Sequence, residues 1–332
     1  MKVLNNMIKN VILVMVLLVA GVLFACAKED EKTPVENPTG GDQTPEEPVK
    51  LEKIKVILPS GAPLMAIGGL LDNDAFEFEV TNGPDALGPA LMGNDYDIVI
   101  APLNLGAKQH TLGKTSFKLD SIITTNNTYL VSKNSLSGVE DLNDINILGY
   151  GQNATPDIVL KAAKTKFNLN YKISYQASAN DVMSLFISGS SEAEYILAAY
   201  PQVTVIKNKL AGQTINVLDV VSLFENSEVF PQACLYVNAS KEKDYSAYLK
   251  LIEENIKLAN EKPADYAKLI ADKHAFFKSL GEDVLKDALP NTNIVYLKAK
   301  DNKAAVNQYV EYLNTYAPAL LSGKTISDEF YN

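Results

Sequence analysis

The sequence predicts an α/β protein made of two similar units and a helical C-terminal segment. Apolar runs with the alternation of strands are each followed by a Gly- or Pro-containing loop and a short helical run across residues 53–110. The same order returns across residues 133–208, and beyond residue 245 apolar residues recur every three or four positions. Strands that alternate with helices indicate mostly parallel sheets covered by helices.

The first unit contains three strand–loop–helix steps. Residues 53–58, "KIKVIL", alternate like a strand and lead into "PSGAP" and an apolar helical run. Residues 76–80 and 96–101 are the next two strands, and the loops after them contain "NGPD" and "PLN". In open α/β sheets ligands collect at the carboxyl ends of the strands, so we expect these loops to border one cleft.

The second unit begins with a strand, a Gly-rich loop and a helix in "INILGYGQNATPDIVL". Gly149 and Gly151 permit a tight loop, Thr155 can cap a helix, and Pro156 suits its first turn. The free N–H groups of a helix start attract an anion or a polar group. No Gly-Lys-Ser/Thr follows the glycines, so this loop is not a nucleotide-binding P-loop.

The remaining elements complete the predicted order. Residues 171–176 read as a strand, 179–188 as a helix, and a further strand ends at Pro201. Helices follow at residues 245–261, 263–280 and 303–317, each with an apolar face.

Two apolar, β-rich segments at residues 121–132 and 230–238 bracket the second unit, and we predict that they are the two crossing strands of a hinge. The predicted lobe I then comprises residues 51–131 and 237–332, and the predicted lobe II comprises residues 132–236.

The N-terminus predicts export. Residues 11–24 carry no charge and are too short for a membrane span, which needs about 20 residues, but are typical of a signal-peptide core. They end in "LFAC", which resembles the bacterial lipobox. The resemblance implies cleavage after residue 25 and a diacylglycerol on Cys26. The alternative is an uncleaved anchor, and in either case the folded part is tethered outside the cytoplasmic membrane.

A spacer of residues 26–50 follows and includes Cys26. It contains four prolines and seven acidic residues and almost nothing apolar, so we predict that it is disordered. Of the formal net charge of −10, the spacer contributes −4 and the signal segment +2, so residues 51–332 carry −8. A body this acidic argues against a nucleic-acid partner, because such binding depends on basic residues that neutralise phosphates.

Composition excludes several kinds of chemistry. His110 and His274 are the only histidines, and Cys234 is the only thiol besides Cys26. A transition-metal site is therefore not expected, and neither is an intramolecular disulfide. A His-dependent hydrolase is poorly supported, since no Gly-x-Ser-x-Gly occurs. We predict no cofactor and no metal.

The basic residues constrain the ligand. All 30 of them are lysine, so the bidentate arginine clamp on a carboxylate or sulfonate is missing. This favours a neutral or weakly polar heterocycle, such as a pyrimidine or a flavin-like vitamin precursor, stacked on Tyr150 or Tyr200.

Several segments of residues 51–332 together resemble the extracytoplasmic solute-binding proteins of ABC importers, in the branch associated with nitrate, sulfonates, taurine and thiamine-precursor pyrimidines. The segments, in order, are "PSGAP", "DYDIVIAPLNLGAK", "TYLVSKNSLSGVEDLNDINILGYGQNATPDIVL", "LAAYPQVTV", "FPQACLYVN", "ALPNTNIVYL" and "LSGKTISDEFYN". The resemblance implies a two-lobed periplasmic-binding-protein fold of type II, the venus flytrap, which closes on one solute. It also implies a monomer that catalyses nothing and delivers its solute to a membrane permease and the permease's ATPase.

The resemblance also implies ligand contacts. The implied residues are Ser60, Gly61, Ala62, Asn104, Asn126, Asn127, Gln152, Asn153, Thr155, Tyr200 and Gln202. Asn104 and Thr155 fit equally well as helix caps, and Gly61 as a turn residue. We expect alanine at positions 127 and 153 to abolish solute binding with little loss of melting temperature.

Three other functions fit parts of the pattern. A sensor or adhesin lipoprotein could keep the fold without transport, and neighbouring permease or receptor-kinase genes would distinguish the two. A related enzyme group makes the thiamine pyrimidine from its own histidine and a pyridoxal cofactor, but the export signal and the scarce histidines argue against it. A flytrap for a metal or oxyanion is disfavoured by the same histidine count.

Overall fold

The computed structural model describes residues 51–224 and 228–332, which belong to one compact unit. The predicted signal segment, Cys26 and the spacer lie outside the described residues. Within the described ranges, no helix is both long enough and apolar enough to cross a bilayer.

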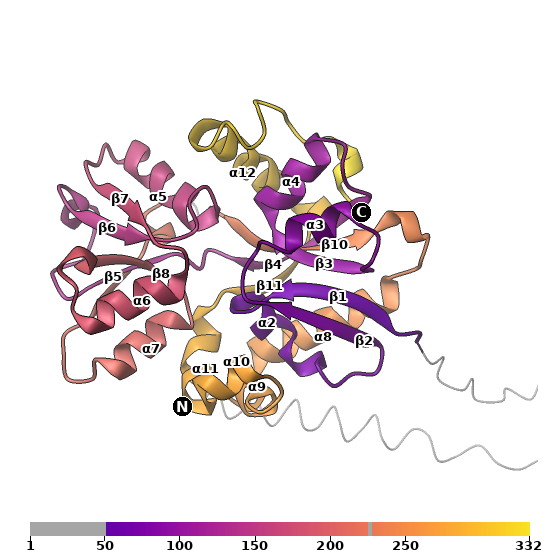
Figure 1. Cartoon of the computed structure of the whole chain (residues 1–332), viewed down its shortest axis with the longest axis horizontal. Coiled ribbons are helices and arrows are strands. Elements are labelled where there is room, and N and C mark those ends of the chain that lie inside the picture. Colours follow the sequence, from indigo (N-terminus) through magenta and orange to yellow (C-terminus); the bar gives the residue numbers. More distant parts are fainter. Residues whose placement is uncertain (1–50, 225–227) are drawn as a thin grey trace, which may run out of the picture. The chain divides into compact units, whose positions relative to one another are not determined.

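Two separate sheets organise this unit (Figure 1). The first has the order β2-β1-β3-β10-β4-β11, in which β1 is parallel to β2 and β3, and β10 is antiparallel to β3 and β4. Its strands are β1 (Ile54–Pro59), β2 (Phe76–Thr81), β3 (Ile98–Pro102), β4 (Phe117–Thr125), β10 (Pro231–Asn238) and β11 (Ile294–Lys298). We call this sheet and its helices lobe I.

The second sheet, with its helices, forms lobe II and has the order β7-β6-β8-β5-β9. Strand β6 is parallel to β7 and β8, whereas β5 is antiparallel to β8 and β9. Its strands are β5 (Tyr129–Ser132), β6 (Asn146–Gly149), β7 (Lys172–Tyr175), β8 (Tyr195–Ala198) and β9 (Asn216–Asp219). The two-sheet arrangement confirms the predicted α/β class.

The helices pack on both sheets. Lobe I carries α2 (Ala62–Ile67), α3 (Leu87–Met92), α4 (Leu103–Thr111), α8 (Ser246–Glu261), α9 (Pro263–Ile270), α10 (Ala275–Leu280), α11 (Glu282–Ala288) and α12 (Lys303–Tyr316). Lobe II carries α5 (Thr155–Lys166), α6 (Ala179–Ser188) and α7 (Gln202–Lys209). The helix predicted over residues 263–280 is two helices, because the His274 side chain accepts a hydrogen bond from the Phe276 N–H and caps a new start.

The chain crosses between the lobes twice, and both crossings differ from the predicted strands. The segment predicted as one strand over residues 121–132 is divided between the sheets, since Asn126 has the left-handed φ of 50° and ends β4. The predicted boundaries at 131/132 and 236/237 fall inside β5 and β10. By sheet membership, one crossing lies at residues 126–128, and the other follows β9, which ends at Asp219, and precedes β10, which begins at Pro231.

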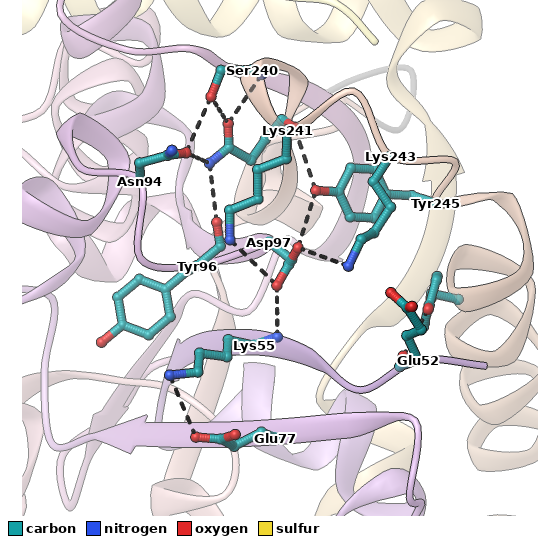
Figure 2. Close-up of polar contacts among 12 residues, drawn as sticks. Glu52, Lys55, Glu77, Asn94, Tyr96, Asp97, Ser240, Lys241, Lys243 and Tyr245 are labelled. Carbon is teal, nitrogen blue, oxygen red and sulfur yellow. Dashed lines mark hydrogen bonds and ion pairs between the residues drawn. The ribbon is translucent and has the colours of Figure 1, made fainter. Parts of the chain in front are cut away.

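A buried carboxylate joins three strands of lobe I at the end opposite the strand carboxyl ends of β1 and β3 (Figure 2). Asp97, only 5% exposed, accepts a hydrogen bond from the Lys55 N–H at 2.9 Å. The ammonium groups of Lys241 and Lys243 each lie 3.5 Å from its oxygens. The Asp97 carbonyl accepts from the Asn238 N–H at the end of β10. Asp97 therefore links β1, β3 and β10.

The thiol of Cys234 provides a test of the packing of β10. Its side chain is 0% exposed, and burial raises the pKa of the thiol, so the reactive thiolate is disfavoured. In a Cys26→Ser variant, whose one thiol is Cys234, we expect no reaction with a thiol-specific disulfide reagent at pH 8 until the protein is unfolded in guanidinium. A stoichiometric reaction of the folded protein within the mixing time would contradict the buried position of this strand.

A candidate solute-binding cleft

Loops at the carboxyl ends of strands from both lobes border one cavity of about 250 Å³. Lobe I contributes the loops after β1 and β3, and lobe II contributes the loops after β6 and β8. This is the edge of an open α/β sheet at which ligands bind. The lining residues are Pro59, Ser60, Gly61, Ala62, Pro63, Pro102, Thr124, Asn127, Tyr150, Ala154, Thr155, Pro156, Ala179, Ala199, Tyr200, Gln202, Gln232 and Ala233.

The cavity brings together seven of the predicted site residues, namely Ser60, Gly61, Ala62, Asn127, Thr155, Tyr200 and Gln202. Gly61 has a φ of 93° directly before α2, a backbone conformation that only glycine adopts readily. Asn104, Asn126, Gln152 and Asn153 are not among the lining residues. Gln152 is exposed to solvent.

The Asn127 side chain is fully engaged by the protein. Its Nδ2 donates to the Tyr200 carbonyl at 2.9 Å, and its Oδ1 accepts from the Tyr200 N–H at 2.8 Å. The side chain of Gln232 in turn donates to the Asn127 carbonyl and accepts from the Asn127 N–H, each at 3.2 Å. Asn127 thus holds Tyr200 in the wall, and the expectation that alanine there costs little stability is not supported.

The other hinge asparagine ties the two crossings to each other. Asn126 Oδ1 accepts from the Phe230 N–H at 2.7 Å, and its Nδ2 donates to the Glu228 carbonyl at 3.0 Å. Its own carbonyl accepts from Asn293 Nδ2 at 3.2 Å. Asn126 therefore acts in the hinge and not in the cavity wall.

Hydrogen bonds join the lobes beside the cavity. Asn104 Nδ2 donates to the Asn153 carbonyl at 3.2 Å, while the Asn104 Oδ1 atom is buried without a partner in the described residues. Thr155 Oγ1 lies 3.1 Å from the Pro231 carbonyl, to which it donates, and 2.8 Å from the Tyr309 hydroxyl. Neither Asn104 nor Thr155 is a helix cap, because Pro102 and Ala154 hold those positions.

The partial positive charge at the N-terminus of α5 is balanced by an acidic residue of the same helix. Asp157 is completely buried, and its Oδ2 accepts from the Asn153 N–H at 2.6 Å and from Lys161 Nζ at 2.8 Å. Its Oδ1 accepts from the Tyr175 hydroxyl at 2.6 Å. The loop reaches this arrangement through Gly151 and Asn153, which have φ values of 62° and 64°. A carboxylate at this position is stabilised by the partial positive charge of the helix start.

Several polar groups of the wall remain available to a ligand. The described residues supply no hydrogen-bond partner for the hydroxyls of Ser60, Tyr150 and Tyr200 or for the Gln202 amide. Burial raises the pKa of Tyr150 and of Tyr200, so both phenols stay neutral at physiological pH. The Tyr200 ring packs edge-on against Tyr129 at 5.0 Å between centroids.

Sequence reasoning named Tyr150 only as a stacking candidate and did not name Gln232 as a site residue. The sequence around Gln232 carries no local pattern that would indicate a site residue. Gln232 lies on β10 of lobe I and reaches the cavity wall from there. Within the described residues, no group of three or more His, Cys, Asp or Glu side chains is arranged to hold a metal ion.

Solved structures of binding proteins are similar in fold. The chain aligns with an ABC transporter protein of Parabacteroides distasonis at 21% identity and a TM-score of 0.70, over 84% of this chain and 98% of that one. It aligns with the periplasmic aliphatic sulphonate binding protein of Escherichia coli at 14% identity and a TM-score of 0.65, over 85% and 92% of the two chains. The alkanesulfonate-binding protein of Xanthomonas axonopodis pv. citri, bound to MOPS, aligns at 13% identity and a TM-score of 0.53, over 81% and 94%.

No family model matches the sequence, and no curated protein is similar to it. The structural likeness is nevertheless nearly end to end, because it includes almost the whole of each neighbour. The chain has the two-lobed α/β fold of the periplasmic binding proteins of ABC transporters.

Proposed function

We propose that this protein is an extracytoplasmic solute-binding lipoprotein that captures a small organic solute between its lobes and delivers it to an ABC importer. The observation that carries the proposal is the cavity lined from both lobes at the carboxyl ends of their strands. Because two crossings join the lobes, a solute that contacts both walls stabilises their closed arrangement. The fold shared with importer binding proteins supports the same conclusion.

The wall residues divide by role. Ser60, Tyr150, Tyr200 and Gln202 have polar atoms without partners in the described residues, and we assign them to direct solute contact. Gly61 and Ala62 bring the backbone of lobe I to the cavity. The side chains of Asn127, Thr155 and Gln232 hold the wall through the hydrogen bonds given above. The pair of Asn104 and Asn153 joins the lobes beside the solute.

The proposal includes the membrane anchor and the partners. Lipid on Cys26 and the spacer of residues 27–50 would keep a monomeric body beside the membrane that holds the permease. The permease and its ATPase then act on the closed, loaded form. A sensor lipoprotein would bind solute in the same cleft, so reconstituted uptake with a permease separates the two functions.

A thermal-shift measurement with yeast extract, which contains most vitamins, bases and amino acids, tests the binding function. A ligand present at about 100 times its dissociation constant stabilises a protein by about 2.7 kcal/mol, which corresponds to about 5 °C for a body of this size. We expect a rise of that order in melting temperature, and dialysis should reverse it.

Two tryptophan variants control this measurement. Ala154→Trp places an indole in the cavity wall and should abolish the shift, whereas Lys257→Trp on the exposed face of α8 should retain it. An equal shift in both variants would mean that the solute binds outside the cleft. No shift in the unmodified protein would argue against the proposed function.

A further inference from the structure

The fold alone does not determine whether the cleft binds a charged or an uncharged solute, but the side chains that line it do. None of the 18 lining residues is an aspartate, glutamate, lysine or histidine, and the sequence contains no arginine. An anion that enters such a cavity loses its hydration and gains no cation in return. Burying an unpaired charge is costly, so these walls disfavour an anionic solute.

The start of α5 does not supply the missing positive charge. Thr155 and Pro156 line the cavity, and the buried carboxylate of Asp157 follows them directly. Lys161, the first lysine of the helix, is already bound to Asp157 at 2.8 Å and to Asn153 Oδ1 at 3.2 Å. The positive end of this helix is therefore already matched by Asp157, and Lys161 is already engaged and is not available to pair with a second anion.

The walls instead suit a flat, uncharged molecule. Tyr150 and Tyr200 border the cavity together with four prolines and five alanines. Aromatic rings favour stacked or edge-on contact with another ring. A cavity of about 250 Å³ has room for a single ring with small substituents.

The polar groups of the wall determine which hydrogen-bonding groups that molecule needs along its edge. Gln202 is partly buried at the first position of α7, and its amide carries a donor and an acceptor side by side. Such an amide pairs with a ligand edge that also offers a donor beside an acceptor. A carboxylate or sulfonate offers acceptors only, so it leaves the Gln202 carbonyl without a partner.

We infer that the cleft selects an uncharged, single-ring aromatic solute with an amide-like edge, and that Gln202 is the residue that discriminates against anions. The inference rests on the proposed binding function and names its solute class. It differs from what the names of the sulfonate-binding neighbours state for those proteins.

Matched pairs of probes test the inference, because each pair keeps the ring and replaces an uncharged NH2 donor by an anionic oxygen. The pairs are benzamide with benzoate, nicotinamide with nicotinate, and benzenesulfonamide with benzenesulfonate. The chain contains no tryptophan, so Tyr150→Trp introduces a single indole at the cavity wall. Lys257→Trp on α8 serves as the control for collisional quenching by free probe.

We expect saturable quenching of the Tyr150→Trp indole by the uncharged members, with affinities about tenfold or more above those of their anionic partners. The exposed indole of Lys257→Trp should show only linear quenching. Adding Gln202→Lys to Tyr150→Trp should reverse the preference, because the wall then carries a cation. Adding Gln202→Leu instead should lower the affinity of the uncharged probes more than that of the anions, whereas the loss of a residue with only a structural role would lower both affinities equally.

The outcomes separate the inference from the proposed function. Saturable binding of anions in preference to uncharged probes, lost on addition of Ala154→Trp in a thermal-shift assay, would overturn the inference and leave the binding function intact. No saturable binding of any probe by Tyr150→Trp, together with no melting shift of the unmodified protein by the same probes, would also overturn the inference, and the yeast-extract measurement would then decide the function independently. If Tyr150→Trp does not fold, melting shifts of the unmodified protein with the same pairs give the same comparison.

Discussion

Replacing Asp97 by alanine is expected to lower the free energy of unfolding by about 3 kcal/mol, a fall in melting temperature of about 5 °C. The substitution leaves the Lys55 N–H without its acceptor and removes the counter-charge of Lys241 and Lys243. Because the two ammonium groups are partly exposed and can turn to solvent, we place the loss at the lower end of the range for a broken buried pair. Equilibrium unfolding in urea, together with a melting curve, measures it.

The neighbouring pair of Lys55 and Glu77 is the matched control, and both appear in Figure 2. Their side chains are 57% and 58% exposed and lie 3.9 Å apart. Exposed pairs contribute about 0–1 kcal/mol, so Glu77→Ala should leave the melting temperature nearly unchanged. Equal melting temperatures for Asp97→Ala and Glu77→Ala would show that the buried carboxylate does not join the strands as described.

Replacing Asn127 by alanine is expected to cost about 3 kcal/mol and to weaken solute binding as well. Asn127 is 3% exposed, and its loss leaves the N–H and the carbonyl of Tyr200 without partners inside the protein. Because Tyr200 forms part of the cavity wall, its displacement changes the shape of the site. The measurements are urea unfolding and the solute-induced melting shift.

Two further variants make this test specific. Asn127→Asp keeps the acceptor for the Tyr200 N–H but places a negative oxygen against the Tyr200 carbonyl, so it should not restore stability. Asn134→Ala, at an exposed position of lobe II, should be neutral. If Asn127→Ala abolished solute binding without any loss of stability, the side chain would contact the solute and not the Tyr200 backbone.

The sequence predicted elements well where both ends carry local signals. Helix α6 has the predicted bounds, because Ser178 caps its start and Gly189 ends it with a φ of 80°. It failed where a strand continues in apolar residues across a change of sheet, as at residues 121–132. There the break is made by the left-handed backbone of Asn126, which two adjacent asparagines indicate only weakly.

The candidate site was likewise predicted only in part from the sequence. The loops at the ends of predicted strands reach the cavity as expected, because the parallel order of strands determines their edge. The roles of the asparagines could not be predicted, since the partner of Asn127 lies 73 residues away and that of Asn104 lies 49 residues away. The pairing of Asn127 depends on β5 lying beside β8, and that of Asn104 depends on how the lobes come together, and no local pattern records either.

The nested connectivity of the lobes has a consequence for biosynthesis. Lobe II is continuous between its two crossings, whose backbones meet where the Asn126 N–H donates to the Phe230 carbonyl at 3.2 Å. The sheet of lobe I, in contrast, needs β10 between β3 and β4 before it is complete. As the exported chain emerges on the far side of the membrane, lobe II can finish folding while β1 to β4 still wait for β10. The lobe that begins the chain is therefore the last to be assembled.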